Sequence, residues 1–208
     1  MSNSNFNIYN SIMIISGPSG SGKSTLCNKI LNKDANIVKS ISYTTRSIRK
    51  GEVNGEDYYF ISNDEFEDLI SKNQMVEYTK IYDHYYGTPL RFIEESFAQG
   101  RDIIFDIESQ GAKFIMNKFP KESFGVFILP SSIQDLEDRL VKRARDSEQE
   151  IATRLHNARN EINQIEFYNY IIVNEDLNKS SEDVLSILRA ERLRRVKIMN
   201  LKKLINLY

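Results

Sequence analysis

The chain has 208 residues, and 40% of them are apolar, which is enough to fill the core of one large domain. Its 28 lysines and arginines nearly balance its 29 aspartates and glutamates, so the overall charge gives no reason to expect nucleic acid, a membrane or a polyanionic partner. The single cysteine excludes an internal disulfide, and the sequence shows neither a secretory signal nor an apolar run long enough to span a membrane. We therefore expect a cytoplasmic protein.

Apolar periodicity predicts strands and helices that alternate along most of the chain. Residues 12–16 form a short buried strand that ends at Gly17, and a helix follows in which Leu26, Ile30 and Leu31 share one face. After residue 100 the pattern predicts strands at 102–107, 124–129 and 171–173 and helices at 110–117, at 133–143 and from about residue 181. This alternation indicates an α/β fold with a parallel sheet, whose ligands bind at the carboxyl ends of the strands.

Residues 40–88 interrupt this alternation. They contain β-like segments at 40–43, 58–61 and 74–79, a turn around Gly55, and a short helix that Asn63 can cap. We interpret them as an insertion with its own small sheet. The predicted organisation is one domain, 1–208, with a core of 8–39, 89–140 and 156–208, an insertion at 40–88 and a lid at 141–155, where the polar stretch 143–153 is expected to move.

One motif indicates nucleoside triphosphate binding. The segment Gly17-Pro18-Ser19-Gly20-Ser21-Gly22-Lys23-Ser24-Thr25 fits G-x-x-x-x-G-K-[ST] at every fixed position, between a predicted strand and a predicted helix. Its backbone N–H groups and the helix N-terminus are expected to hold phosphate oxygens, with Lys23 on the β- and γ-phosphates and the Ser24 hydroxyl on Mg²⁺. The alternative is a glycine-rich loop that matches by chance.

A carboxylate is predicted near this loop. Asp106 ends the apolar strand Ile103-Ile-Phe-Asp106, where P-loop proteins place the acid that holds Mg²⁺, often through water. Without the P-loop, an ordinary aspartate at the end of a strand would be an equally good interpretation.

The insertion carries two arginines, Arg46 and Arg49, among hydroxyl-bearing residues and tyrosines. Each guanidinium can place two N–H groups on a phosphate, and a phenol adds a directional donor. Taken alone, a pair of arginines in a loop is more often a solvated surface.

Here the sequence resembles a known family. Thr44-Thr-Arg46-x-x-Arg49-x-Gly-Glu-x-Asn-Gly-x-Asp-Tyr58 is similar to the GMP-binding signature of guanylate kinases. The P-loop, Tyr85-Tyr-Gly87, Asp106-Ile-Glu-x-Gln-Gly111 and Ile172-Val-Asn174 follow in the family's order, and the resemblance covers about residues 10–190. It implies a P-loop NTPase fold with an inserted GMP-binding subdomain and a mobile lid. It also implies transfer of the γ-phosphoryl group of MgATP to GMP, and to dGMP, in purine nucleotide metabolism.

The resemblance assigns roles to individual residues. Arg46, Arg49, Tyr58 and Tyr86 would hold the GMP phosphate, and Ser42, Glu77, Thr88 and Glu108 would surround the guanine. Asn174 would join the P-loop residues at ATP. A carboxylate such as Glu77 accepts from both N1–H and N2–H₂ of guanine, whereas adenine presents a lone pair at N1. Leaving such buried polar groups unpaired can reject a wrong base by ~10⁴ or more.

The resemblance further implies that Arg143 and Arg154 reach over the phosphoryl group in transfer, where charge accumulates. The alternative is a solvated helix face, because Asp135, Glu137 and Asp138 offer salt-bridge partners nearby. Three positions depart from the family pattern. Ile48 replaces a proline, Glu108 replaces a common aspartate, and Ala144-Arg145 replaces a glycine-containing stretch, which weakens the register of the lid arginines.

Two other functions compete with this prediction. One is a guanylate-kinase-like module that binds proteins without catalysis, against which the intact Gly22, Lys23 and Ser24 argue. The other is a kinase for a different nucleotide or small metabolite, which the segment from Arg46 to Tyr58 and Glu77 disfavour less strongly.

Overall fold

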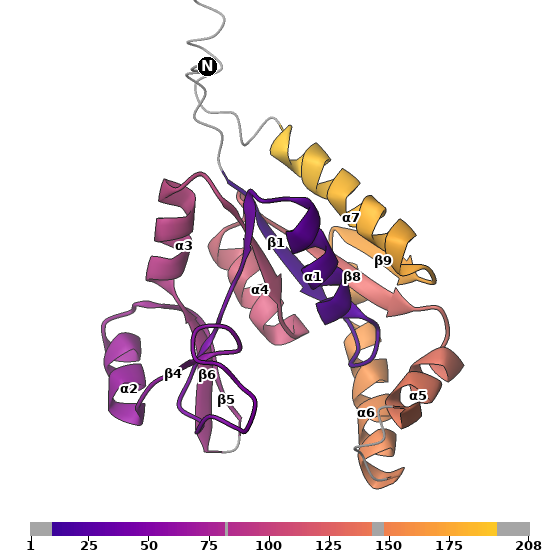
Figure 1. Ribbon diagram of the computed structural model, residues 1–208, viewed down its shortest axis with the longest axis horizontal. Coiled ribbons are helices and arrows are strands. Elements are labelled where there is room, and N and C mark those ends of the chain that lie inside the picture. Colours follow the sequence, from indigo (N-terminus) through magenta and orange to yellow (C-terminus); the bar gives the residue numbers. More distant parts are fainter. Residues whose placement is uncertain (1–9, 82, 143–147, 195–208) are drawn as a thin grey trace, which may run out of the picture.

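The computed structural model describes residues 10–81, 83–142 and 148–194, and its centre is a five-stranded parallel sheet (Figure 1). The strand order is β2–β7–β1–β8–β9. The bounds are β1 Ile12–Ser16, β2 Ile37–Lys39, β7 Asp102–Asp106, β8 Ser123–Pro130 and β9 Tyr170–Asn174. The predicted strand at 12–16 and the parallel α/β class are confirmed.

The middle strand β1 is buried along its whole length, which explains its uninterrupted apolar sequence. Its side chains alternate between two cores. Met13 and Ile15 belong to the core on one face of the sheet, and Ile12 and Ile14 to the core on the other. A strand in this position needs helices on both sides.

Four helices supply this cover (Figure 1). Helices α1 (Lys23–Lys33) and α7 (Leu177–Arg192) pack on one face, and α3 (Leu90–Ala98) and α4 (Ser109–Lys118) on the other. Helices α5 (Ile133–Lys142) and α6 (Glu148–Ile162) pack on each other through Leu136, Leu155 and Ala158, and a short 3₁₀ helix, η1 (Ile165–Phe167), leads to β9. No helix in the described part of the chain is long and apolar enough to cross a membrane.

A second sheet of four strands, in the order β4–β3–β6–β5, lies between residues 43 and 89. Strands β3 and β4 are parallel and the other pairs are antiparallel. The elements are β3 Tyr43–Thr44, β4 Tyr59–Phe60, β5 Met75–Ile81, β6 His84–Pro89 and the helix α2 Asn63–Ser71. Figure 1 shows this sheet and the α5–α6 pair as two arms on either side of the main sheet.

Several predicted elements differ from the observed ones. β2, β6 and α3 were not predicted, because β2 is only three residues long and β6 contains histidine and glycine. Ser62 caps α2 in place of Asn63, and α7 begins at Leu177 with Asp176 as its cap, earlier than residue 181. Within the stretch predicted to move, 148–153 belongs to α6, and Arg143 and the rest of 143–147 lie outside the described residues.

Candidate active site

The P-loop connects β1 to α1 in a conformation that depends on glycine. Gly22 is the N-cap of α1 and has a φ of 96°, which side chains rarely adopt. A Cβ on Gly22 would also lie 2.5 Å from Nδ2 of Asn174. Asn174 is buried at the end of β9, where its side-chain amide donates to the carbonyl of Ser21 at 2.8 Å. The loop is therefore fixed by the neighbouring strand, and the N–H groups of the first turn of α1 remain available to an anion.

Lys23 lies within this loop. Its ammonium group donates to the carbonyl oxygen of Gly17 and, at 3.0 Å, to that of Pro18. Burial lowers the pKa of Lys23 below its usual value, although the carboxylates of Asp106, Glu161 and Glu108 act in the opposite direction. A mostly buried cation beside a turn of free N–H groups is suited to phosphate.

Two oxygen ligands that suit a magnesium ion meet at the edge of the sheet. The Ser24 hydroxyl donates to Oδ2 of Asp106 at 2.7 Å, because β1 and β7 are neighbours and α1 begins above them. Mg²⁺ is commonly held by one or two protein oxygens, with waters and substrate phosphates completing its shell. The pair fits this pattern, and no cluster of three metal-binding side chains occurs among the described residues.

A cavity of about 550 Å³ lies between the small sheet, the carboxyl end of β7 and the N-terminal half of α4. Six of the residues predicted for the acceptor and metal sites line it: Ser42, Tyr58, Glu77, Tyr86, Asp106 and Glu108. They come from segments more than 60 residues apart, so the fold brings them together. Five of the predicted acceptor-side residues and the Asp106 carboxylate thus share one cavity, whereas Arg46, Arg49 and Thr88 are not among the residues that line it.

Glu77 stands on β5 and enters the cavity from the small sheet. Oε1 accepts from the hydroxyl of buried Thr88 at 2.9 Å, across the β5–β6 pair. Burial raises the pKa of Glu77 above its usual value, and the hydrogen bond from Thr88 offsets only part of this. A Cβ on Gly111 would lie 3.7 Å from Oε2, so a glycine at the start of α4 leaves the space beside this oxygen open.

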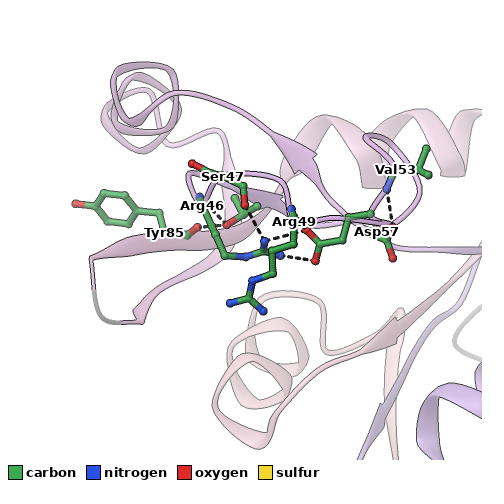
Figure 2. A network of polar contacts seen from close by, with 8 residues as sticks. Arg46, Ser47, Arg49, Val53, Asp57 and Tyr85 are labelled. Carbon is green, nitrogen blue, oxygen red and sulfur yellow. Dashed lines mark hydrogen bonds and ion pairs between the residues drawn. The ribbon is translucent and has the colours of Figure 1, made fainter. Parts of the chain in front are cut away.

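Arg46 follows β3 and is only 9% exposed. Its guanidinium lies over the rings of Tyr58 and Phe60, at 5.4 and 5.5 Å from their centroids, and also interacts with the phenol of Tyr86. Burial opposes the charge on Arg46, but its hydrogen bonds with Glu52 keep the pKa above its usual value. Arg49 is exposed on the same turn, and Figure 2 shows the two arginines side by side.

The lid arginines are only partly described. Arg154 is half-buried on α6, and Arg143 lies outside the described residues. A third arginine approaches the P-loop instead. Nη1 of Arg139 would be 4.0 Å from a Cβ on Gly22, and Arg139 pairs with Asp135 one turn earlier on α5 at 2.7 Å. The sequence analysis did not single out Arg139, although the spacing of Asp135 and Arg139 is typical of a helical ion pair.

Comparison with known proteins decides the family. The guanylate kinase family model matches residues 9–191, which is most of the chain. The chain belongs to the guanylate kinase family. The resemblance in the signature residues is thereby confirmed, and the chain is an enzyme of the nucleoside monophosphate kinase class.

Individual guanylate kinases are similar along nearly the whole chain. One from Rhizobium meliloti is 43% identical over 195 residues, which cover 94% of this chain and 89% of that protein. One from Rickettsia felis is 46% identical over 181 residues, 87% of this chain and 94% of that protein. The crystal structure of guanylate kinase from Anaplasma phagocytophilum matches with a TM-score of 0.77 at 34% identity, and covers 96% of this chain and 95% of that chain.

Two residues of this guanylate kinase escaped the sequence prediction. Glu52 contacts Arg46, and Glu161 on α6 acts electrostatically on Lys23. Glu161 has a buried Oε2 without a hydrogen-bond partner in the described structure, and burial raises its pKa. An electrostatic interaction between distant residues, such as that of Glu161 with Lys23, leaves no mark on local periodicity.

Proposed function

We propose that this chain transfers the γ-phosphoryl group of MgATP to GMP, and to dGMP, to give a guanosine diphosphate and ADP. The observation that carries the proposal is the shared cavity, in which Glu77 and Asp106 both present carboxylates. Glu77 suits a guanine edge, and Asp106 is hydrogen-bonded to the P-loop hydroxyl of Ser24. An acceptor bound by its base at Glu77 would therefore point its phosphate toward the donor site.

The acceptor would be held at both ends. Glu77 would accept from N1–H and N2–H₂ of guanine, with Ser42, Thr88 and Glu108 around the base. Arg46, Arg49, Tyr58 and Tyr86 would hold the phosphate. Charge-assisted and bidentate hydrogen bonds are the strongest available to an enzyme for this purpose, and they also fix the phosphate's orientation.

The donor would be held by the P-loop. Lys23 would exchange the carbonyls of Gly17 and Pro18 for the β- and γ-phosphate oxygens, and Asn174 would hold the loop from below. Ser24 and Asp106 would hold Mg²⁺, the latter through water. When bound, the ion neutralises negative charge on the phosphates and orients them.

Catalysis would consist of positioning and charge neutralisation. Phosphoryl transfer has little need of covalent chemistry from the protein, because donor and acceptor oxygens only have to lie in line. Arg143 and Arg154 would reach over the phosphoryl group from a lid at 141–155, while the insertion at 40–88 carries GMP toward ATP. We place this reaction in the cytoplasm and in purine nucleotide metabolism.

The test is a coupled assay of ADP formation with GMP, dGMP, AMP, CMP and UMP as acceptors. We expect turnover with GMP and dGMP, and rates at least ~10³-fold lower with the others. Lys23→Ala should lower turnover by ~10³-fold or more, because it removes the positive charge that the P-loop offers to the phosphates. The midpoint of thermal unfolding should stay unchanged. Equal rates with AMP and GMP, or a fully active Lys23→Ala variant, would contradict the proposal.

A further inference from the structure

Glu52 contacts both Arg46 and Arg49, which Figure 2 shows within one network of polar contacts. Its two carboxylate oxygens accept from Nη1 and Nη2 of Arg46 at 2.9 and 2.8 Å, a bidentate pair. Oε2 also accepts from the backbone N–H of Arg49 at 2.8 Å. One carboxylate therefore fixes the guanidinium of the first arginine and the backbone of the second.

The way Arg46 is held leaves one of its edges for a ligand. A guanidinium has five N–H donors in one plane. Glu52 takes two of them, and the Ser47 carbonyl accepts another from Nη1 at 2.8 Å. The guanidinium also shares a hydrogen bond with the phenol of Tyr86. The donors that Glu52 and Ser47 leave, one on Nε and one on Nη2, form a second edge. That edge matches the spacing of two phosphate oxygens, so Arg46 has room for both Glu52 and a phosphate.

The turn around Glu52 is itself held in place. The N–H of Glu52 donates to the carbonyl of Arg49 at 3.1 Å, and the N–H of Val53 donates to Oδ2 of Asp57 at 2.8 Å. On the other side of Arg46, its N–H donates to the Thr44 hydroxyl, which in turn donates to the carbonyl of Tyr85. Glu52 thus connects a rigid turn to the arginine, so that the guanidinium has one orientation.

Glu52 stays charged at every pH at which the enzyme would work. The hydrogen bonds from Arg46, and then the one from the Arg49 backbone, lower the pKa of Glu52 to about 2. A neutral residue at this position would leave a nearly buried guanidinium without its counter-charge.

We propose that Glu52 is a positioning residue for recognition of the acceptor phosphate, because one carboxylate holds both the guanidinium of Arg46 and the backbone of Arg49. This rests on the proposed function, in which those arginines bind the phosphate of GMP. Glu52 does not touch the nucleotide. A competing interpretation is that Glu52 imitates the phosphate and is displaced by it. Glu52 uses only the Nη1–Nη2 edge, which argues against displacement, since the phosphate can approach the Nε–Nη2 edge instead.

The test compares GMP with guanosine in binding to Glu52→Gln by titration calorimetry, with Glu56→Gln as the matched control. Glu56 lies in the same loop and is exposed. We expect Glu52→Gln to raise the Kd of GMP about tenfold, because a charged bidentate contact becomes a single neutral one. The Kd of guanosine should change less than twofold, since it has no phosphate. Glu56→Gln should change neither, and thermal unfolding should show that all variants fold.

A double-mutant cycle with Arg46→Ala separates the possible failures. If Glu52 acts through Arg46, Glu52→Gln should change GMP binding less than twofold in the Arg46→Ala background. Tighter GMP binding by Glu52→Gln would establish displacement and overturn the proposal. Equal weakening of GMP and guanosine would show a merely structural role and also overturn it. If Arg46→Ala itself leaves GMP binding unchanged, the proposed phosphate site is wrong. If Arg46→Ala weakens GMP binding and Glu52→Gln does not, the proposed phosphate site is supported but the positioning role of Glu52 is wrong.

Discussion

At the scale of single residues, the proposed base pocket depends on a carboxylate that the fold has largely removed from water. Glu77 is held by the hydroxyl of Thr88, and its second oxygen faces the space that Gly111 leaves open. A buried acceptor of this kind discriminates between bases because a base without a matching N–H leaves the carboxylate without a hydrogen bond, which costs binding free energy.

Glu77→Gln should therefore change base preference. The amide replaces one acceptor by a donor that opposes a guanine N–H, so kcat/KM for GMP should fall by about 10- to 100-fold. AMP should lose nothing or gain slightly. Glu67→Gln, at an exposed position on α2, is the control and should leave both values unchanged. If the ratio of kcat/KM for GMP to that for AMP is unaltered, Glu77 does not contact the base.

The same carboxylate predicts a pH dependence. The raised pKa means that Glu77 takes up a proton at a higher pH than an ordinary glutamate, and a protonated carboxyl loses an acceptor. The affinity for guanosine should be highest above this raised pKa, where Glu77 is ionised. It should fall as pH falls through the pKa. Guanosine is the right probe because the phosphate of GMP titrates near pH 6. Titration calorimetry between pH 4 and about 8 should show this dependence in the wild type and lose it in Glu77→Gln.

At the scale of secondary-structure elements, the start of α2 shows how a cap is decided. The Ser62 hydroxyl accepts from the N–H of Glu65 at 3.1 Å, and the Glu65 carboxylate accepts from the N–H of Ser62 at 2.8 Å. Asn63, the residue that the sequence favoured, is already the first helical residue. Both residue types are good caps, so the sequence alone left a choice of one position.

Ser62→Ala should lower the free energy of unfolding by about 1 kcal/mol, since it removes one half of the capping box. Asn63→Ala is the matched control, and it should cost less than about 0.5 kcal/mol because alanine is a good helix former. Urea unfolding followed by circular dichroism measures both. If Asn63→Ala lowers the free energy of unfolding more than Ser62→Ala does, Asn63 and not Ser62 is the cap.

At the scale of the whole molecule, Arg192 ties three elements together at the edge of the sheet away from the cavity. On the last turn of α7, its Nε donates to Asp102 at the start of β7 at 2.6 Å, and Nη1 donates to Asp34 after α1 at 2.7 Å. Although burial alone would raise it, the pKa of Asp34 is held below its usual 3.8 by the hydrogen bond from Arg192 and its neighbours.

Arg192→Met should lower the free energy of unfolding at pH 7 by about 2 kcal/mol, as two charged hydrogen bonds are lost and the apolar stem is kept. Asp34 stabilises the fold above its ordinary pKa, and this contribution disappears as pH falls through its lower value in the folded state. The difference between variant and wild type should therefore shrink below about pH 4. Arg101→Met, at an exposed position, is the control. If the difference in the free energy of unfolding between Arg192→Met and the wild type does not depend on pH, Arg192 stabilises the fold through packing and not through its ion pairs.

The two arms seen in Figure 1 predict closure. Phosphoryl transfer must exclude water, or ATP would be hydrolysed. The arm that carries the small sheet and the α5–α6 arm lie on either side of the main sheet. With GMP and a non-hydrolysable ATP analogue together, small-angle scattering should give a smaller radius of gyration than for the free protein. GMP alone should give an intermediate value. An unchanged radius would contradict a lid mechanism.

The sequence by itself determined the features that are local. The P-loop is nine contiguous residues whose glycines and hydroxyls specify their own conformation, and the four apolar residues at the start of β1, followed by a glycine-rich turn, are typical of a buried strand. The signature from Thr44 to Tyr58 was sufficient to predict the family, because its spacing is specific. Such features depend on neighbours along the chain, and these are visible in a sequence.

The tertiary structure decided which side chains meet. Glu77 faces Thr88 and Gly111 only because β5 pairs with β6 and α4 lies beside them. Arg139 on α5 likewise approaches Gly22 from a distant part of the chain, whereas Glu52 reaches Arg46 within one loop. The free energy of these contacts depends on burial and on distances between residues far apart in the chain, and neither is encoded in local periodicity. Strand pairing and helix docking supply both.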